Sequence, residues 1–256
     1  MKKFSAFLFV LLLMLASFTA GMEYPRGDVD QNGEVNIADV TCLIDYIMTG
    51  TWDNEPVTPP EDDGHEYVDL GLPSGTLWAT MNIGSSKPEE YGDYFAWGET
   101  KRKDVYEWST YKWCEGTDST MTKYCIHSNY GTIDNKTELE PEDDAAYVNW
   151  GPLWRTPTAE QQQELIDHCS WIVTTSNGKR IIKVTGPNGN SMLLPATGYV
   201  TDSWVHNVSE WGYYWSRDLN PNQSSSACFL ATKSGFQLCS NTFRYLGVAV
   251  RAVRVQ

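Results

Sequence analysis

Oxygen-bearing side chains recur at a fixed spacing in residues 28–39. The groups that this spacing directs to one centre belong to Asp28, Asp30, Asn32, Glu34, Asn36 and Asp39. Glu34 would contribute its main-chain carbonyl, and Gly33 permits the sharp turn beside it. Because calcium takes about six to eight oxygen ligands, the spacing predicts a Ca²⁺ site.

An amphipathic helix is expected directly after this loop. Ile37, Val40, Ile44 and Ile47 recur three or four residues apart, and Asn36 can cap the first turn. The stretch GDVDQNGEVNIADVTCLIDYIMTG resembles one repeat of a bacterial dockerin. The resemblance implies calcium binding and a possible cohesin-like partner. It is incomplete, because cellulosome dockerins carry two such repeats and one is found here.

The first residues have the pattern of a secretory signal peptide. Lys2 and Lys3 precede an apolar run from Phe4 to Ala20 that ends in small residues. We therefore expect residues 1–21 to be removed, and the mature protein to be secreted or held at the cell surface without a membrane span. Export would permit disulfide bonds among the cysteines.

Charge divides the chain into two regions. Acidic residues outnumber basic ones by 33 to 19, giving a net charge of −14 that disfavours nucleic acid as a partner. Residues 51–64 combine prolines with acids and have little to bury, which is typical of a linker. We expect a calcium loop and helix in residues 22–50 and a large domain in residues 65–256.

The large domain is predicted to have an α+β fold with few helices. A hairpin is expected over residues 67–79, and a helix from Thr158, where Thr158 and Gln161 have capping-box spacing. Short strands are expected at Trp171–Thr175, Arg180–Thr185, Ser191–Leu194, Tyr213–Ser216, Ala227–Thr232, Phe236–Cys239 and Val248–Val255.

Several ordered motifs carry a second resemblance. YVDLGLPSGTLWATMNIG, YGDYFAWGET, EDDAAYVNWGPLWRTPTAEQ, GPNGNSMLLPATGY, GYYWS and GVAVRAVR occur in the order expected of the Fibrobacter succinogenes major paralogous domain. This family is frequent in exported proteins of gut bacteria. The resemblance covers nearly all of residues 66–255 and implies a C-type-lectin-like fold, related in outline to formylglycine-generating and sulfatase-modifying enzymes. Kinship of fold does not confer their chemistry.

Aromatic side chains are the candidate ligand-binding groups of this domain. The Glu-Pro-Asn, Gln-Pro-Asp and Trp-Asn-Asp triplets through which C-type lectins hold sugar by calcium are absent, so a calcium-dependent sugar site is disfavoured there. Flat rings also stack on sugars and anchor protein interfaces. The candidates in the loop-rich final third are Trp204, Trp211, Tyr213, Tyr214 and Tyr245. Core packing is expected for Trp78, Trp97, Trp154 and Trp215, which lie inside the family motifs.

The cysteines leave two alternatives open. A hairpin turning at Lys233 and Ser234 would place Cys228 opposite Cys239, close enough for a disulfide, but two buried free thiols fit equally well. Late cysteines would also suit an oxidase of the formylglycine-generating type. The acidic run 140–144 is expected to be a solvated loop rather than a glycosidase site.

Two arginines fall on the family motifs of the large domain. Arg155 and Arg251 are each expected to form an internal salt bridge or main-chain clamp. The pattern of the whole chain favours an exported, non-enzymatic protein, active in adhesion or carbohydrate binding, that binds a glycan or protein ligand. The alternatives are an enzyme of the sulfatase-modifying type and a scaffold that docks through the dockerin-like segment.

Overall fold

The computed structural model describes residues 64–176 and 178–255, together with Val35, Val40 and Leu43. The chain divides into two units, residues 1–62 and 63–256. The predicted signal peptide and the predicted calcium ligands lie outside the described residues; these ligands are Asp28, Asp30, Asn32, Glu34, Asn36 and Asp39. Within the first unit, Val40 and Leu43 have a helical backbone.

The second unit has a sheet-rich α+β fold, as predicted. Its strands pair antiparallel in four small sheets of order β1-β2-β12-β3, β4-β5-β6, β7-β8 and β11-β10-β9. The strands are β1 (Tyr67–Asp69), β2 (Leu77–Ala79), β3 (Trp154–Arg155), β4 (Ser170–Ser176), β5 (Lys179–Thr185), β6 (Ser191–Pro195), β7 (Tyr199–Thr201), β8 (Trp204–His206), β9 (Gly212–Leu219), β10 (Ser226–Lys233), β11 (Phe236–Phe243) and β12 (Val253–Arg254).

Helices are few in residues 64–255, again as predicted. The α-helices there are α3 (Ala145–Trp150) and α4 (Ala159–His168), and the 3₁₀ turns are η1 (Trp108–Thr110) and η2 (Pro141–Asp143). The capping box of Thr158 and Gln161 is present at the start of α4, so this prediction is confirmed. The sequence analysis missed α3.

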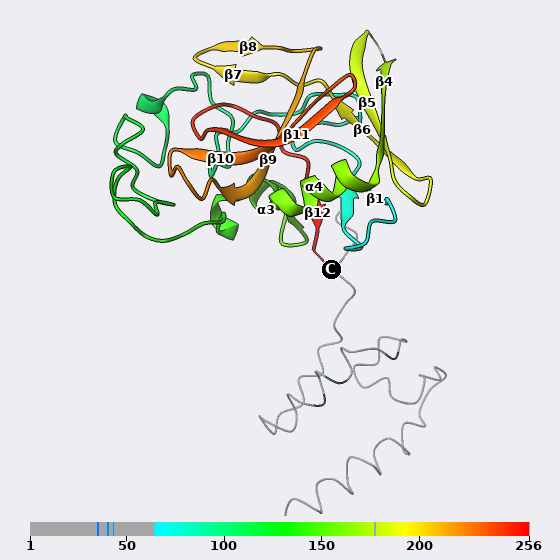
Figure 1. The fold of residues 1–256 in the computed structure, drawn as a ribbon, viewed down its shortest axis with the longest axis horizontal. Helices are drawn as coiled ribbons and strands as arrows, with labels where there is room; N and C mark the ends of the chain where they lie inside the picture. The colour runs from blue at the N-terminus through cyan, green and yellow to red at the C-terminus, as the bar shows by residue number, and fades with distance from the viewer. Residues whose placement is uncertain (1–34, 36–39, 41–42, 44–63, 177, 256) are drawn as a thin grey trace, which may run out of the picture. The chain divides into compact units, whose positions relative to one another are not determined.

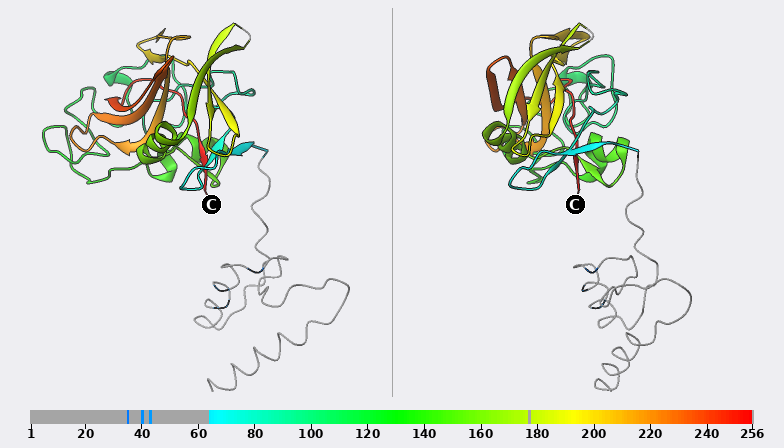
Figure 2. Two further views of the ribbon diagram at one scale, coloured as in Figure 1. Left: turned by 45° about the vertical axis from the view of Figure 1, so that its right-hand side comes forward. Right: turned by 90° about the vertical axis from the view of Figure 1, so that its right-hand side faces the viewer.

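The central sheet β9–β10–β11 separates two parts of the core. α4 packs on one face of this sheet, where Leu165 meets Tyr214 and Leu230 in one apolar cluster. Side chains alternate between the faces of a strand, so Trp215 and Phe229 point the other way, into a second cluster. Figures 1 and 2 show α4 on the lower side of the molecule and the β7–β8 hairpin on the upper side.

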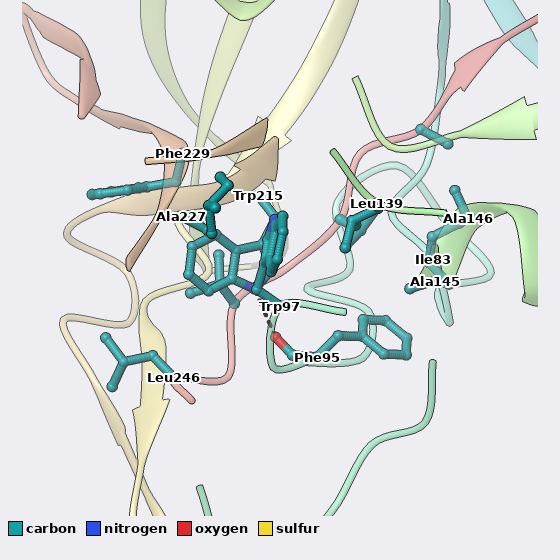
Figure 3. Packing of buried hydrophobic residues seen from close by; sticks show 14 of the residues in the cluster. Ile83, Phe95, Trp97, Leu139, Ala145, Ala146, Trp215, Ala227, Phe229 and Leu246 are labelled. Carbon is teal, nitrogen blue, oxygen red and sulfur yellow. Dashed lines mark hydrogen bonds between the residues drawn. The ribbon is translucent and has the colours of Figure 1, made fainter. Parts of the chain in front are cut away.

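Two tryptophans tie the second cluster together. Trp215 Nε1 donates to the Phe95 carbonyl at 2.8 Å (Figure 3). Trp97 Nε1 donates to the Ser216 carbonyl at 2.9 Å. Each indole therefore buries its ring without leaving its N–H unpaired, which would be costly. Trp78 and Trp154 are also buried, so core packing is confirmed for the four tryptophans predicted there.

Long loops connect Ala79 to Ala145, and a buried arginine holds them. Arg244 is fully buried and donates to the carbonyls of Lys123, Tyr124 and Ser224. Its Nε donates to the Tyr111 hydroxyl at 2.8 Å. These bonds replace the water that the guanidinium loses on burial, so one side chain fixes segments distant in sequence.

The predicted strands are confirmed in outline and corrected in two places. Strands are present at each predicted position, except that the last is only Val253–Arg254 rather than the whole of 248–255. The β10–β11 hairpin has a different register from the one predicted. Lys233 pairs with Phe236, so its turn consists of Ser234 and Gly235. Gly235 has a φ of +70°, which glycine adopts without steric cost, and this preference sets the turn one residue later.

Candidate functional site

The β7–β8 hairpin presents several aromatic side chains on one face. Tyr199 pairs with His206, and Thr201 pairs with Trp204, so these four side chains project to the same side. Trp204 is 73% exposed, and His206 is also exposed. The exposure of a tryptophan in a short, regular hairpin is unusual, because burial of its ring would favour folding by about 1.5–3 kcal/mol.

Both ends of this hairpin are fixed. At the tip, Asp202 and Tyr106 exchange two main-chain hydrogen bonds of 2.7 and 2.9 Å. At the base, Gly198 has a φ of +65° and lies so close to His206 that a Cβ atom would sit 2.1 Å from the His206 carbonyl oxygen. Only glycine allows this approach. The hairpin therefore holds its rings in a defined position.

The aromatic face continues onto the central sheet. Tyr199 lies 5.4 Å from His206 and 5.5 Å from Tyr213, measured between ring centroids. Tyr213 is stacked beside Trp211 at 5.8 Å, and Trp211 meets Phe236 edge-on at 5.8 Å. We call this set the ring strip; its members are Trp204, His206, Tyr199, Tyr213, Trp211 and Phe236.

The ring strip rests on the core and carries polar groups beside its rings. Tyr199, Trp211 and Tyr213 are partly buried against the cluster that contains Trp215. Asn207 donates from Nδ2 to the Tyr213 hydroxyl at 3.3 Å. Burial raises the pKa of Tyr213, so its hydroxyl stays protonated at neutral pH and remains a hydrogen-bonding group. Flat rings with adjacent polar groups suit a ligand with apolar faces and hydroxyl edges.

The five predicted aromatic residues do not all belong to this surface. Trp204, Trp211 and Tyr213 are brought together in the ring strip. The prediction that Tyr214 binds a ligand is wrong. Its side chain points to the opposite face of β9, is 1% exposed and donates its hydroxyl proton to the Pro195 carbonyl. Tyr245 packs instead against Trp108 and Phe243, with ring centroids 4.8 and 5.9 Å away.

Sequence reasoning missed Tyr199, His206 and Phe236. Two of them carried a usable signal, since Tyr199 and Thr201 alternate on one side of Asp202-Ser203, and Trp204 and His206 alternate on the other. This is the spacing of a two-residue hairpin with one aromatic face. Phe236 reaches the strip only through the pairing of distant strands, which no local pattern shows.

The hairpin register decides between the two alternatives left open for the cysteines, against the disulfide and in favour of free thiols. Cys228 lies opposite Asn241, and Cys239 lies opposite Leu230, so the two cysteines are not paired directly, and both are free thiols. Burial raises the pKa of each thiol to about 11. Both are therefore protonated at neutral pH and poor nucleophiles.

The acidic run 140–144 is solvated only in part, because Glu142 is exposed but the last two carboxylates are buried. Asp143 and Asp144 are both 2% exposed. Asp144 caps α3 by accepting from Ala146 N, and it also accepts from Thr156. Asp143 accepts from Lys123 Nζ at 2.6 Å and from the Tyr124 hydroxyl at 2.8 Å. These carboxylates hold the loop in place. Apart from the cap to Ala146, their partners lie too far along the chain for a local pattern to reveal.

The expected internal clamp is present at one of the two arginines in the family motifs and not at the other. Arg251 is buried and donates to Asn82 Oδ1 and to the carbonyls of Ala79, Thr80 and Leu193 at 2.8–3.0 Å, so the main-chain clamp is confirmed. Arg155 forms no comparable clamp. Its Nε has no hydrogen-bond partner among the described residues.

A small cavity lies in the core of the second unit. The cavity between Trp97, Glu99, Asp143 and Trp215 has a volume of about 10 Å³, which is room for about one water molecule. Among the described residues, no three His, Cys, Asp or Glu side chains converge to hold a metal ion.

Comparison with family models, curated proteins and solved structures finds no match to this chain. No helix within the described residues is long and apolar enough to cross a membrane. The ring strip is therefore interpreted from its own geometry.

Proposed function

We propose that this chain is an exported, non-enzymatic surface or extracellular protein that binds a glycan through the ring strip. The observation that carries the proposal is the ring strip, in which five rings, from His206 to Phe236, make successive centroid contacts of 5.4–5.8 Å. Trp204 projects from the same face of the hairpin as His206 and is 73% exposed. Exposed and partly exposed rings gathered in this way are suited to stack on sugar faces.

Rigidity supports this use of the surface. Tyr199, Trp211 and Tyr213 already pack on the core, and the hairpin that carries Trp204 is bonded at its tip to Tyr106. A ligand therefore orders few side chains when it binds, and each side chain left free would cost about 0.5–1.5 kcal/mol to immobilise. Protein ligands also use aromatic anchors, but the open, polar-edged row favours a glycan.

The resemblance in sequence extends the proposal. A domain of residues 65–256 with the C-type-lectin-like fold of the Fibrobacter succinogenes major paralogous family agrees with the few helices and short antiparallel strands described above. Residues 22–50 would add a dockerin-like segment that binds Ca²⁺ through Asp28, Asp30 and Asp39 with the other loop oxygens. Docking of this segment onto a cohesin-like partner is the scaffold alternative.

The enzyme alternative has less support. Chemistry of the formylglycine-generating type requires reactive thiols late in the chain, and a reactive thiol needs a lowered pKa. Burial raises the pKa of Cys228 and of Cys239 to about 11. A binding function uses the exposed rings and asks nothing of these buried sulfurs.

A glycan array tests the proposal. Full-length protein should bind a subset of glycans, and Trp204→Ala should reduce that binding at least about tenfold, because the Trp204 side chain is 73% exposed and so is open to a ligand. Ile172→Ala is the matched control, since Ile172 is 62% exposed on β4 and lies outside the ring strip. The proposal would be overturned if the unmodified protein bound no glycan, or if Trp204→Ala and Ile172→Ala lost binding equally.

A further inference from the structure

A lysine lies over one end of the ring strip. Lys233 is the last residue of β10, and its Nζ is 4.2 Å from the centroid of the Trp211 ring and 5.8 Å from that of Phe236. Both contacts are cation–π interactions. They hold the ammonium group close to the rings instead of leaving it free in solvent.

This ammonium differs from three of the lysines that contact aromatic rings, and within the described residues it shares the lack of an ion pair with Lys179, which lies over Tyr91 away from the ring strip. Lys103, Lys112 and Lys123 also lie over rings, and each of them is paired with a carboxylate at 2.5–3.2 Å. Lys233 forms no ion pair within 4.0 Å in the described part of the chain. Its three N–H donors are thus available to a ligand. The carboxylate of Glu210, next to Trp211 in the chain, also acts on the strip, where it contributes to the raised pKa of Tyr213.

An ammonium in this position would strengthen binding to an anion. A hydrogen bond to a charged group is stronger than a bond between neutral groups. Part of the entropy cost of ordering a lysine side chain is already met by the ring contacts. The chain's net charge of −14 repels anions at long range, but salt screens charges beyond about 8 Å.

We propose that the glycan bound by the ring strip carries an anionic group, a carboxylate or a sulfate, that pairs with Lys233 at the Trp211 end. This inference rests on the proposed function and names the class of its ligand. The rings would bind the sugar faces, whereas Lys233 would select acidic sugars over their neutral counterparts.

The test compares matched acidic and neutral oligosaccharides on the full-length protein. One arm uses oligogalacturonate and its methyl ester, and the other a sulfated galactan oligomer and its desulfated form, so that the two sources of charge are distinguished. We expect at least one acidic form to bind about tenfold more tightly than its neutral partner, a difference of about 1.4 kcal/mol.

Variants assign that preference to one side chain. Lys233→Gln should abolish the acidic preference, and Lys233→Arg should retain it. Lys179→Gln is the matched control, because its ammonium lies 4.6 Å from the Tyr91 ring, away from the ring strip, and should keep the preference. Trp204→Ala should weaken both forms.

Two outcomes separate this inference from the proposed function. Equal binding of acidic and neutral forms by the unmodified protein, or an acidic preference that survives Lys233→Gln, would overturn the inference and leave glycan binding standing. Failure of every oligosaccharide to bind would overturn both.

Discussion

Buried arginines organise this domain at the residue scale. Arg244 and Arg251 are almost fully buried, and both donate mainly to main-chain carbonyls rather than to carboxylates. Burial lowers the pKa of Arg251 to about 10, which reflects the cost of removing its charge from water. The hydrogen bonds offset this cost, and they join the first sheet to β6 through Leu193.

Replacing Arg251 should therefore destabilise the protein strongly. Arg251→Ala leaves Asn82 Oδ1 and the carbonyls of Ala79, Thr80 and Leu193 without this donor, and we expect the free energy of unfolding to fall by about 3 kcal/mol or more. Urea titration would measure the change. Arg254→Ala, which removes a surface contact with Tyr67, should cost less than about 1 kcal/mol. If both variants lost a similar free energy of unfolding, the conclusion that Arg251 clamps the main chain would be contradicted.

The β10–β11 hairpin shows how one element depends on a single turn residue. Its register places Phe236 opposite Lys233, which brings both side chains to Trp211. Gly235 gives the turn its positive φ, and no atom lies within 4 Å of where its Cβ would be. A substitution there would meet only a backbone penalty, not a clash.

Gly235→Ala should lower the free energy of unfolding by about 1 kcal/mol. Thermal unfolding followed by circular dichroism would detect the change, with Ser234→Ala as the control at the neighbouring turn position. The free energy of unfolding of the Ser234→Ala control should stay within about 0.5 kcal/mol of that of the unmodified protein. If Gly235→Ala is as stable as the unmodified protein, the turn geometry described above is wrong.

Local patterns in the sequence predict the strands better than their pairing. Alternation and turn residues located the positions of β4 to β6 and β9 to β11, and the capping box located α4. The register of the β10–β11 hairpin was wrong by one turn position, because Ser234-Gly235 and Lys233-Ser234 are both plausible until the φ of Gly235 is known.

The site was predictable only in part, for a related reason. Three of its six rings were identified from their place in the chain, but Tyr214 was assigned with them although it alternates to the other face of β9. The role of Asp143 was missed because its partners Lys112 and Lys123 lie 31 and 20 residues away. Such contacts follow from the packing of distant loops.

At the scale of the whole molecule, the account assigns separate roles to residues 22–50 and residues 65–256. Calcium should bind the first segment and leave the stability of the second unchanged. Carboxylates Asp28, Asp30 and Asp39 would repel one another without the ion, and an isolated helix of about three turns is marginal in water.

Calorimetric titration of the full chain should show one calcium site with submillimolar affinity, and Asp28→Ala with Asp39→Ala should abolish it. The thermal transition of the large domain should be the same in calcium and in chelator. An unchanged titration in the double variant would disprove the calcium assignment.

The central claim is that the ring strip is the binding surface, and the indole N–H resonances of the tryptophans test it most directly. A glycan that binds on the array would be titrated into the labelled protein, with Trp204→Ala and Trp211→Phe used to assign the two strip signals. The account predicts that the signals of Trp204 and Trp211 shift in proportion to occupancy. Those of Trp97 and Trp215, which are 1% and 2% exposed, should stay in place. If the glycan bound saturably while the Trp204 and Trp211 signals did not move, the ring strip would not be the binding surface.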